Sequence, residues 1–328
     1  MISEGICRSR RIAKIDVQTP LLVPSFSSVA CDMPPEMYVI LREHITDASL
    51  ISAYDLYIHE MAQEDIWASD VLFIDSGNYE IRQIKDFLQQ FHKSIVGKPN
   101  EWSFQIYSET VDSLKPPQIT KVVLVNYDEK MDLAKQISTA HDFFERHRQF
   151  AGCFLTKPSD ENSNQVDIEC LVKNVNLMAQ FDVLGFTEKE LGSSLLDRCT
   201  NILKLRKALN SHGSQIPIHV FGCLDPIGII AYFLCGADIF DGTLWLKYGY
   251  HENAALYINN YAVLQHKWAS SYLGVNVASW IQNLIDLRNL MFRMRRYAQD
   301  NNVGIFELGQ PIMKQITELT NTAASSAG

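Results

Sequence analysis

The chain has 328 residues, which is enough for one large α/β barrel of roughly 250 residues with terminal additions, or for two ordinary domains. Its hydrophobic content of 47% and charged content of 20% are typical of a soluble globular protein, and no apolar run reaches the roughly 18 residues of a membrane span. The net charge of −9 excludes a chain-wide electrostatic attraction to nucleic acid, so any such attraction has to come from a local patch or a partner.

The first residues and the cysteines indicate the compartment. The N-terminal segment lacks the apolar core of a signal peptide. The seven cysteines are scattered, form no CxxC pair and end at Cys235. This usage is typical of a reducing compartment and argues against both a disulfide framework and a cysteine zinc site. We therefore expect a cytoplasmic protein.

Short apolar runs that resemble strands recur along the chain, and most are followed by a helical pattern. Alternation of strands and helices over this length predicts a parallel sheet. Because no GxGxxG fingerprint is present, seven or eight such units favour a closed (β/α)8 TIM barrel over a doubly wound sheet. The predicted strands are Leu50–Tyr54, Val71–Ile74, Val122–Val125, Gly152–Leu155, Asp182–Gly185, Ile218–Phe221, Asp238–Phe240 and, with the weakest pattern, Val275–Ala278.

The helical spacing is clearest in two segments. Apolar residues recur every three or four positions from Leu195 to Leu209 and from Leu284 to Ala298. Pro34-Pro35-Glu36 has the proline expected in the first turn of a further helix. We predict a single domain over residues 1–318 with helical additions, followed by a disordered tail over residues 319–328.

Several predicted strands end in residues that can carry chemistry. The strand ends of a parallel barrel converge on one face, so acids there meet in space. Any one of these aspartates also fits the ordinary role of capping the next helix. Two carboxylates on rigid strand ends can divide a glycosyl transfer, one attacking the sugar carbon and the other handling the proton. The strand-end acids are Asp75, Asp128 and Asp241.

Aromatic residues accompany these acids. Tyr79 and Phe221 follow two of the strands and, if they face each other, a flat base between them gains about 1–3 kcal/mol of stacking energy. Both also fit ordinary packing at the barrel rim. Asp128 can accept two N–H donors from a purine edge, or it can be a solvated loop acid before Lys130.

Three motifs give the chain a resemblance to the tRNA-guanine transglycosylase superfamily, enzymes that exchange guanine for a 7-deazaguanine base. The resemblance runs from about Thr19 to about Leu308. Asp75-Ser-Gly-Asn-Tyr79 resembles the family's DSGG(Y/F) strand end. His219-Val-Phe-Gly222 resembles its H-x-x-G segment, and Gly236-Ala-Asp-Ile-Phe-Asp241 resembles its G-x-D-x-F-D nucleophile strand.

The resemblance implies roles for individual residues. Asp241 is expected as the nucleophile on the sugar C1′, and Asp75 as the general acid/base. Tyr79 is expected to stack on the base, and Asp128 to bind the guanine edge. The remaining implied base-pocket residues are Gly185 and Phe186 through their backbones, Glu190, Phe221 and Gly222.

The chain departs from the family pattern in several places. No cysteine follows Cys235, and Gln282 stands where a zinc-binding histidine is expected, so we predict no zinc, no other cofactor and no zinc subdomain. DSGG(Y/F)Q becomes DSGNYE, which is expected to place Glu80 near the nucleophile as a third carboxylate that raises neighbouring pKa values if all are ionised. A base-contacting glutamine expected after the fourth strand is not evident around Phe154–Lys157.

The segment after the nucleophile bears on the substrate. The family's proline-threonine-arginine, which contacts tRNA, is replaced by Leu244-Trp-Leu-Lys247, and Lys247 keeps only the charge. This loss favours DNA over tRNA as the polymer. Basic clusters are more often solvated helix faces, but the best candidates for phosphate contacts besides Lys247 are Arg293, Arg295 and Arg296.

Two alternatives stay open. A non-catalytic barrel subunit supporting an active partner protein fits the loss of zinc, although such a subunit has no need of both acids. A barrel hydrolase of nucleosides or glycosides can use the same two acids with water as the acceptor. The sequence leaves the polymer, the incoming base, the oligomeric state and the need for a partner protein undetermined. We expect no membrane partner.

Overall fold

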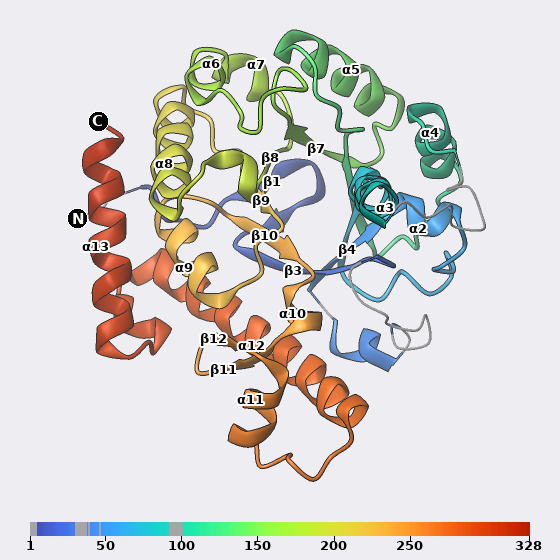
Figure 1. The fold of residues 1–328 in the computed structure, drawn as a ribbon. Helices are drawn as coiled ribbons and strands as arrows, with labels where there is room; N and C mark the ends of the chain where they lie inside the picture. The colour runs from blue at the N-terminus through green and yellow to red at the C-terminus, as the bar shows by residue number, and fades with distance from the viewer. Residues whose placement is uncertain (1–4, 30–37, 39, 46, 92–100) are drawn as a thin grey trace.

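The computed structural model describes residues 5–29, 38, 40–45, 47–91 and 101–328 (Figure 1). The helix predicted to open at Pro34 lies outside these residues.

Eight parallel strands close into a barrel, which confirms the predicted (β/α)8 TIM barrel. Helices surround the barrel (Figure 1), as expected when each strand must return to the same end. Around the barrel the order is β10-β3-β4-β5-β6-β7-β8-β9. The strands are β3 Leu21–Phe26, β4 Ala48–Ser52, β5 Val71–Asp75, β6 Lys121–Val125, β7 Ala151–Thr156, β8 Val183–Thr187, β9 Ile218–Phe221 and β10 Ile239–Gly242.

Seven of the predicted strands are present and one is wrong. Val275–Ala278 lies inside a long helix, α12 (Tyr272–Asp300), where Val275 packs on Ile258 and Tyr261 in a small separate core. The eighth strand is β3, which pairs with β10 on one side and β4 on the other and so closes the barrel. Its sequence contains Pro24, a residue that usually argues against a central strand.

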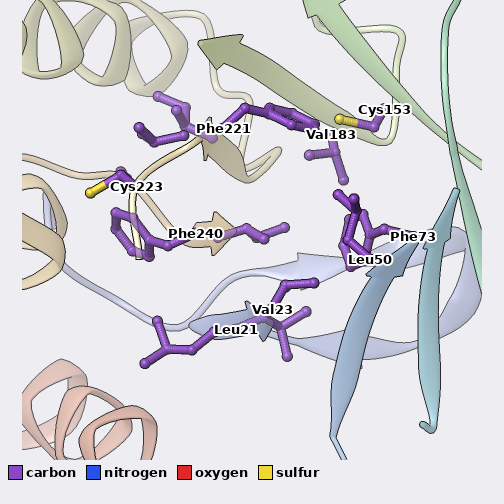
Figure 2. Packing of buried hydrophobic residues seen from close by; sticks show 14 of the residues in the cluster. Leu21, Val23, Leu50, Phe73, Cys153, Val183, Phe221, Cys223 and Phe240 are labelled. Carbon is purple, nitrogen blue, oxygen red and sulfur yellow. The ribbon is translucent and has the colours of Figure 1, made fainter. Parts of the chain in front are cut away.

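Both faces of the barrel strands are buried, which explains their nearly continuous apolar sequences. Val23, Leu50, Phe73 and Val183 come from four different strands and converge on the barrel interior (Figure 2). The alternate residues pack outward under the helices. Residues that pair in register share a face, so this alternation also decides which strand-end side chains point inward.

The sequence starts several helices with standard caps. Helix α8 (Leu195–Ser211) begins with a reciprocal capping box between Ser194 and Asp197, and α9 (Pro226–Leu234) begins with proline after the Asp225 cap. The other helices are α2 Ala53–Tyr57, α3 Asn78–Phe91, α4 Phe104–Asp112, α5 Leu133–Arg146, α6 Ile168–Lys173, α7 Val175–Met178, α10 Leu244–Lys247, α11 Ile258–Leu264 and α13 Gln310–Ser326.

A compact addition follows β10, where the resembled family carries its zinc subdomain. It consists of α10, a two-stranded antiparallel hairpin of β11 (Gly249–His251) and β12 (Ala254–Leu256), and α11. Asn283 of α12 fastens it, accepting from Tyr250 N at 2.7 Å and donating to the backbone oxygens of Trp245 and Tyr248.

The predicted disordered tail is wrong, because residues 310–326 form helix α13. Ile316, Thr320 and Ala323 are buried on one face of this helix, and α13 packs against α8 and α9. The spacing of these three residues is that of an amphipathic helix, which the polar composition of the segment hides.

The amino-terminal end of the barrel is held by buried ion pairs. Asp238, just before β10, lies 2.8 Å from Arg10 and 2.5 Å from Arg206, and all three side chains are buried. The first aspartate of the G-x-D-x-F-D motif is therefore part of a structural clamp at the end opposite the strand-end acids. No helix within the described ranges is both long enough and apolar enough to cross a bilayer.

Candidate active site

The fold brings Asp75 and Asp241 to the carboxyl end of the barrel, which we call the mouth. Asp75 ends β5 and pairs in register with Ser52, while Asp241 pairs with Val23. Val23 points into the barrel (Figure 2), and Asp241 shares its face. Carboxyl ends of barrel strands are where this fold, common among enzymes, carries its chemistry.

Asp241 is buried and only partly satisfied. Its Oδ2 accepts a hydrogen bond from Ser25 Oγ at 2.7 Å. Its Oδ1 lies 3.0 Å from His219 Nε2, but the angles are not those of a hydrogen bond, and Oδ1 and both ring nitrogens of His219 have no hydrogen-bond partner among the described residues. We therefore treat this pair as an electrostatic contact. Buried polar atoms without partners are rare and mark a place where another molecule can bind.

Asp75 carries a perturbed carboxyl. Burial and the neighbouring Asp128 and Asp241 together raise its pKa to about 7, against the opposing effects of the Gly77 N–H and Lys157. A carboxyl with a pKa near neutrality can both donate and accept a proton. The effect of Asp241 on Asp75 also shows that the two acids lie close enough to interact.

Glu80 lies beside Asp75, as the added carboxylate predicted from DSGNYE. Its two oxygens accept hydrogen bonds from Ser27 Oγ at 2.5 Å and Ser52 Oγ at 2.8 Å. Burial, followed by the charges of Asp55 and Asp75, raises its pKa to about 8 against the lowering effect of the two serine hydrogen bonds. Glu80 is therefore neutral at pH 7, and it neighbours the acid/base rather than the nucleophile.

Asp128 is enclosed by donors. Its carboxylate accepts from Ser76 Oγ, from Asn78 Nδ2 at 3.2 Å and from Arg82 Nη2 at 2.9 Å, and Lys157 Nζ lies 3.2 Å from Oδ2. Burial alone would raise the pKa of Asp128, but Lys157 and Arg82 outweigh it and hold the pKa below its ordinary value. Asp128 is therefore ionised and fully hydrogen-bonded.

Lys157 joins Asp128 to Glu190. Glu190 lies in the 3-10 helix Glu188–Leu191 that follows β8, and its two carboxylate oxygens are 3.1 and 3.3 Å from Lys157 Nζ. Lys157 also donates to Thr187 Oγ1 at 2.9 Å, and its side chain is 4% exposed. The lysine stands in the segment where the family pattern has a glutamine.

The two predicted stacking aromatics have different surroundings. Phe221 is buried and stacks on His219 with ring centroids 3.8 Å apart, so one of its faces is occupied. A Cβ atom at Gly185 would lie 2.7 Å from the Phe221 ring, so this glycine makes room for the ring. Tyr79, in the first turn of α3, is 43% exposed. Tyr79 is available for stacking, whereas Phe221 packs as barrel core in this conformation.

The other predicted pocket residues frame this packing. The Phe186 side chain is fully buried and alternates with Gly185, so it faces the surrounding helices and only its backbone is near the mouth. Gly222 has φ +82°, and a Cβ atom there would meet nothing within 4 Å. The chain thus turns away from β9 at a point with open space beside it.

The predicted basic residues do not gather at the mouth. Lys247 is exposed on α10, close to the end of β10. Arg293 instead pairs with Glu307 at 2.5 Å. Arg295 is half-buried, and this burial lowers its pKa against the opposing effect of Asp47, which precedes β4. Because Asp47 marks the amino end of β4, this part of α12 lies at the opposite end of the barrel. Arg296 is exposed on the same stretch of helix.

The described cavities lie away from the two acids. They run along the exposed face of α13, between α12 and strands β3 and β4, and between α2 and α4, and neither Asp75 nor Asp241 lines any of them. Asp241 is 5% exposed. Within the described residues, its carboxyl group therefore has little contact with solvent.

The sequence analysis missed the residues that hold these acids in place. Ser25 sits on the strand that was not predicted, and Asp55, which accepts from Ser28, follows β4 without any motif. Of these residues, Lys157 could have been found from the sequence, because it is a cation that follows the predicted strand Gly152–Leu155 by two residues. Within the described residues, no group of three or more His, Cys, Asp or Glu side chains is arranged to hold a metal ion.

Comparisons with known proteins leave the chain without an assigned family. No protein-family model matches it, and no curated protein is significantly similar.

Proposed function

We propose that this barrel is a base-exchange transglycosylase that replaces guanine in a nucleic acid with a 7-deazaguanine, with DNA favoured over tRNA as the polymer. The observation that carries the proposal is the pair of acids at the mouth. Asp75 has a pKa of about 7 and Asp241 acts on it, while Asp241 keeps one oxygen without a hydrogen bond. The three motifs that resemble the tRNA-guanine transglycosylase superfamily supply the substrate class.

The proposed reaction is a double displacement. A guanine nucleotide turns out of its stack, and Asp241 Oδ1 attacks C1′ of the sugar while the bond to the base breaks. Asp75 donates its proton to the departing guanine. The incoming 7-deazaguanine loses a proton to Asp75 and attacks the same carbon, which releases Asp241 and restores the original anomer. No metal or redox cofactor takes part, and zinc is not needed.

The environment of each acid suits its proposed part. Ser25 fixes one oxygen of Asp241 and leaves the other for the sugar. Burial together with two acidic neighbours raises the pKa of Asp75 to about 7, so both the protonated and the ionised forms are populated at neutral pH and Asp75 can give a proton to the leaving group. His219 Nε2 lies 3.0 Å from Asp241 Oδ1 and the His219 ring stacks on Phe221, so these two rings bound one side of the proposed nucleophile. A cytoplasmic location is part of the proposal and rests on the scattered cysteines.

A second candidate is a non-catalytic subunit that supports an active partner protein. The observation favouring it is the burial of Asp241 Oδ1 beneath packed side chains. Hydrolysis of a nucleoside or glycoside by the same two acids is the third reading, with water in place of the second base.

Incubation of the protein with labelled guanine and either DNA or tRNA separates the three candidates. Incorporation of label into one polymer supports exchange and identifies the polymer. Release of base without incorporation supports hydrolysis, and inertness with both polymers supports the subunit. The Asp241→Asn variant serves as the control, because it keeps the shape of the site and removes the nucleophile.

A further inference from the structure

The carboxylate of Asp128 has little capacity left for a ligand. A carboxylate offers about four lone-pair positions. Ser76, Asn78, Arg82 and Lys157 lie at these oxygens, and the backbone oxygen of Asp128 also accepts from Asn78 and Arg82 at 3.0 Å. A base that bound Asp128 would have to displace one of these four donors, and three of them (Ser76, Asn78 and Lys157) are buried and would be left unsatisfied.

The carboxylate of Glu190 has the opposite character. Among the described residues, Lys157 is the one partner that its side-chain oxygens contact. Its side chain is 14% exposed, against 6% for Asp128. It follows β8 at the mouth, close in sequence to Gly185. Glu190 therefore has acceptor positions that no described side chain occupies, and part of its side chain is exposed.

Lys157 explains how the Glu190 side chain is held in place. Its ammonium group lies between the two carboxylates, and its backbone is fixed by Gln136, which donates to Lys157 O and accepts from Lys157 N, each at 2.9 Å. Asp128 and Arg82 complete a chain of alternating charges across the ends of β6, β7 and β8. A lysine held on both sides orients the acid that still has open positions.

Resting on the proposed function, we propose that Glu190 is the residue that reads the N–H edge of the base, with Lys157 as its positioning residue and Asp128 as an internal counter-ion. Guanine presents N1–H and an exocyclic amino group side by side, and a carboxylate can accept both. Hypoxanthine lacks the amino group, so a site read by Glu190 prefers guanine over hypoxanthine.

Equilibrium binding of labelled guanine and hypoxanthine tests this assignment. The wild type should prefer guanine, and Glu190→Gln should reduce that preference roughly 10- to 100-fold through loss of a charge-assisted hydrogen bond. Asp128→Asn should weaken the binding of both bases to a similar degree. Lys157→Arg should keep more of the guanine preference than Lys157→Met. Glu129→Gln, an exposed neighbour of Asp128, is the matched control.

Glu190→Asp provides a second variant if Glu190→Gln folds poorly. It keeps the negative charge but shortens the side chain by one methylene, so the carboxylate lies farther from the base. This variant should also lose the preference for guanine. A Glu190→Gln protein that keeps the preference while Asp128→Asn loses it overturns the assignment. The proposed function survives that outcome if the wild type still exchanges guanine. A wild type that binds neither base overturns both.

Discussion

At the scale of single residues, burial raises the pKa values of two acids that lie at the mouth. The pKa of Asp75 is raised to about 7 and that of Glu80 to about 8, mainly by burial. Lys157 and Arg82 instead keep Asp128 ionised. Neighbouring carboxyls with pKa values pushed apart are the arrangement that acid/base chemistry at neutral pH requires.

The raised pKa of Glu80 predicts how stability depends on pH. The folded protein holds the proton up to about pH 8, whereas an unfolded glutamate releases it near its ordinary pKa of about 4.3. The folded state therefore binds more protons between these values, and this contribution to stability is lost as the pH rises from about 4 to 8.

Glu80→Gln should remove that loss. Thermal unfolding followed at pH 5 and pH 8 should show little change at pH 5 and a gain of about 1–3 kcal/mol at pH 8. The exposed Glu129→Gln should change neither value. A destabilised Glu80→Gln protein at pH 8 would show that the carboxylate, rather than the neutral acid, is the form that the fold favours.

Residue identities at the mouth were predictable only where a motif named them. Asp75 and Asp241 were placed correctly at the mouth because each follows an apolar strand. The stretch of α12 that carries Arg293 and Arg295 lies near Asp47 at the amino end of the barrel, which sequence alone does not show, and their contact with phosphates stays a prediction. The Asp128 carboxylate fills its hydrogen-bonding positions partly with Arg82 and Lys157, and both of these residues are distant from it in sequence.

At the scale of elements, the turn after β5 sets the direction of the Asp75 strand end. Gly77 has φ +83°, and a Cβ atom there would lie 2.6 Å from Tyr54 Cβ and 2.9 Å from Tyr54 N. Trp102 closes the other side, donating to Ser76 O at 2.9 Å. The glycine is required both by its backbone conformation and by the space around it.

Gly77→Ala should therefore be much more damaging than the same change at Gly213. Gly213 also has a positive φ, +76°, but nothing lies within 4 Å of its Cβ position. We expect a cost of about 1 kcal/mol for Gly213→Ala and at least about 2–3 kcal/mol for Gly77→Ala in chemical denaturation. Equal costs for the two variants would show that the contact with Tyr54 relaxes easily.

Helix α13 makes a second prediction at this scale. Ile316 is 4% exposed where α13 meets the barrel helices. Ile316→Ala should destabilise the protein by about 2 kcal/mol or more, whereas the exposed Glu318→Ala should be nearly neutral. The comparison is read from denaturation midpoints. If both are neutral, α13 is not packed in solution and the residues behave as the tail that the sequence suggested.

At the scale of the whole molecule, the barrel separates stability from chemistry. The amino end holds the Arg10–Asp238–Arg206 clamp, and the mouth holds the acids. The barrel itself was predictable because strands and helices alternate along the chain. Strand β3 was not, because Pro24 interrupts its pattern, and closure of the barrel is a long-range property that ties the beginning of the chain to β10.

The central claim is that Asp241 forms a covalent bond to a sugar. Its most direct test is the intact mass of the protein after mixing with a guanine-containing DNA or tRNA oligonucleotide and quenching in acid. We predict a wild-type species heavier by the oligonucleotide without one guanine, and no such species for Asp241→Asn. The same adduct on Asp241→Asn, or its absence with both polymers for the wild type, would contradict the account.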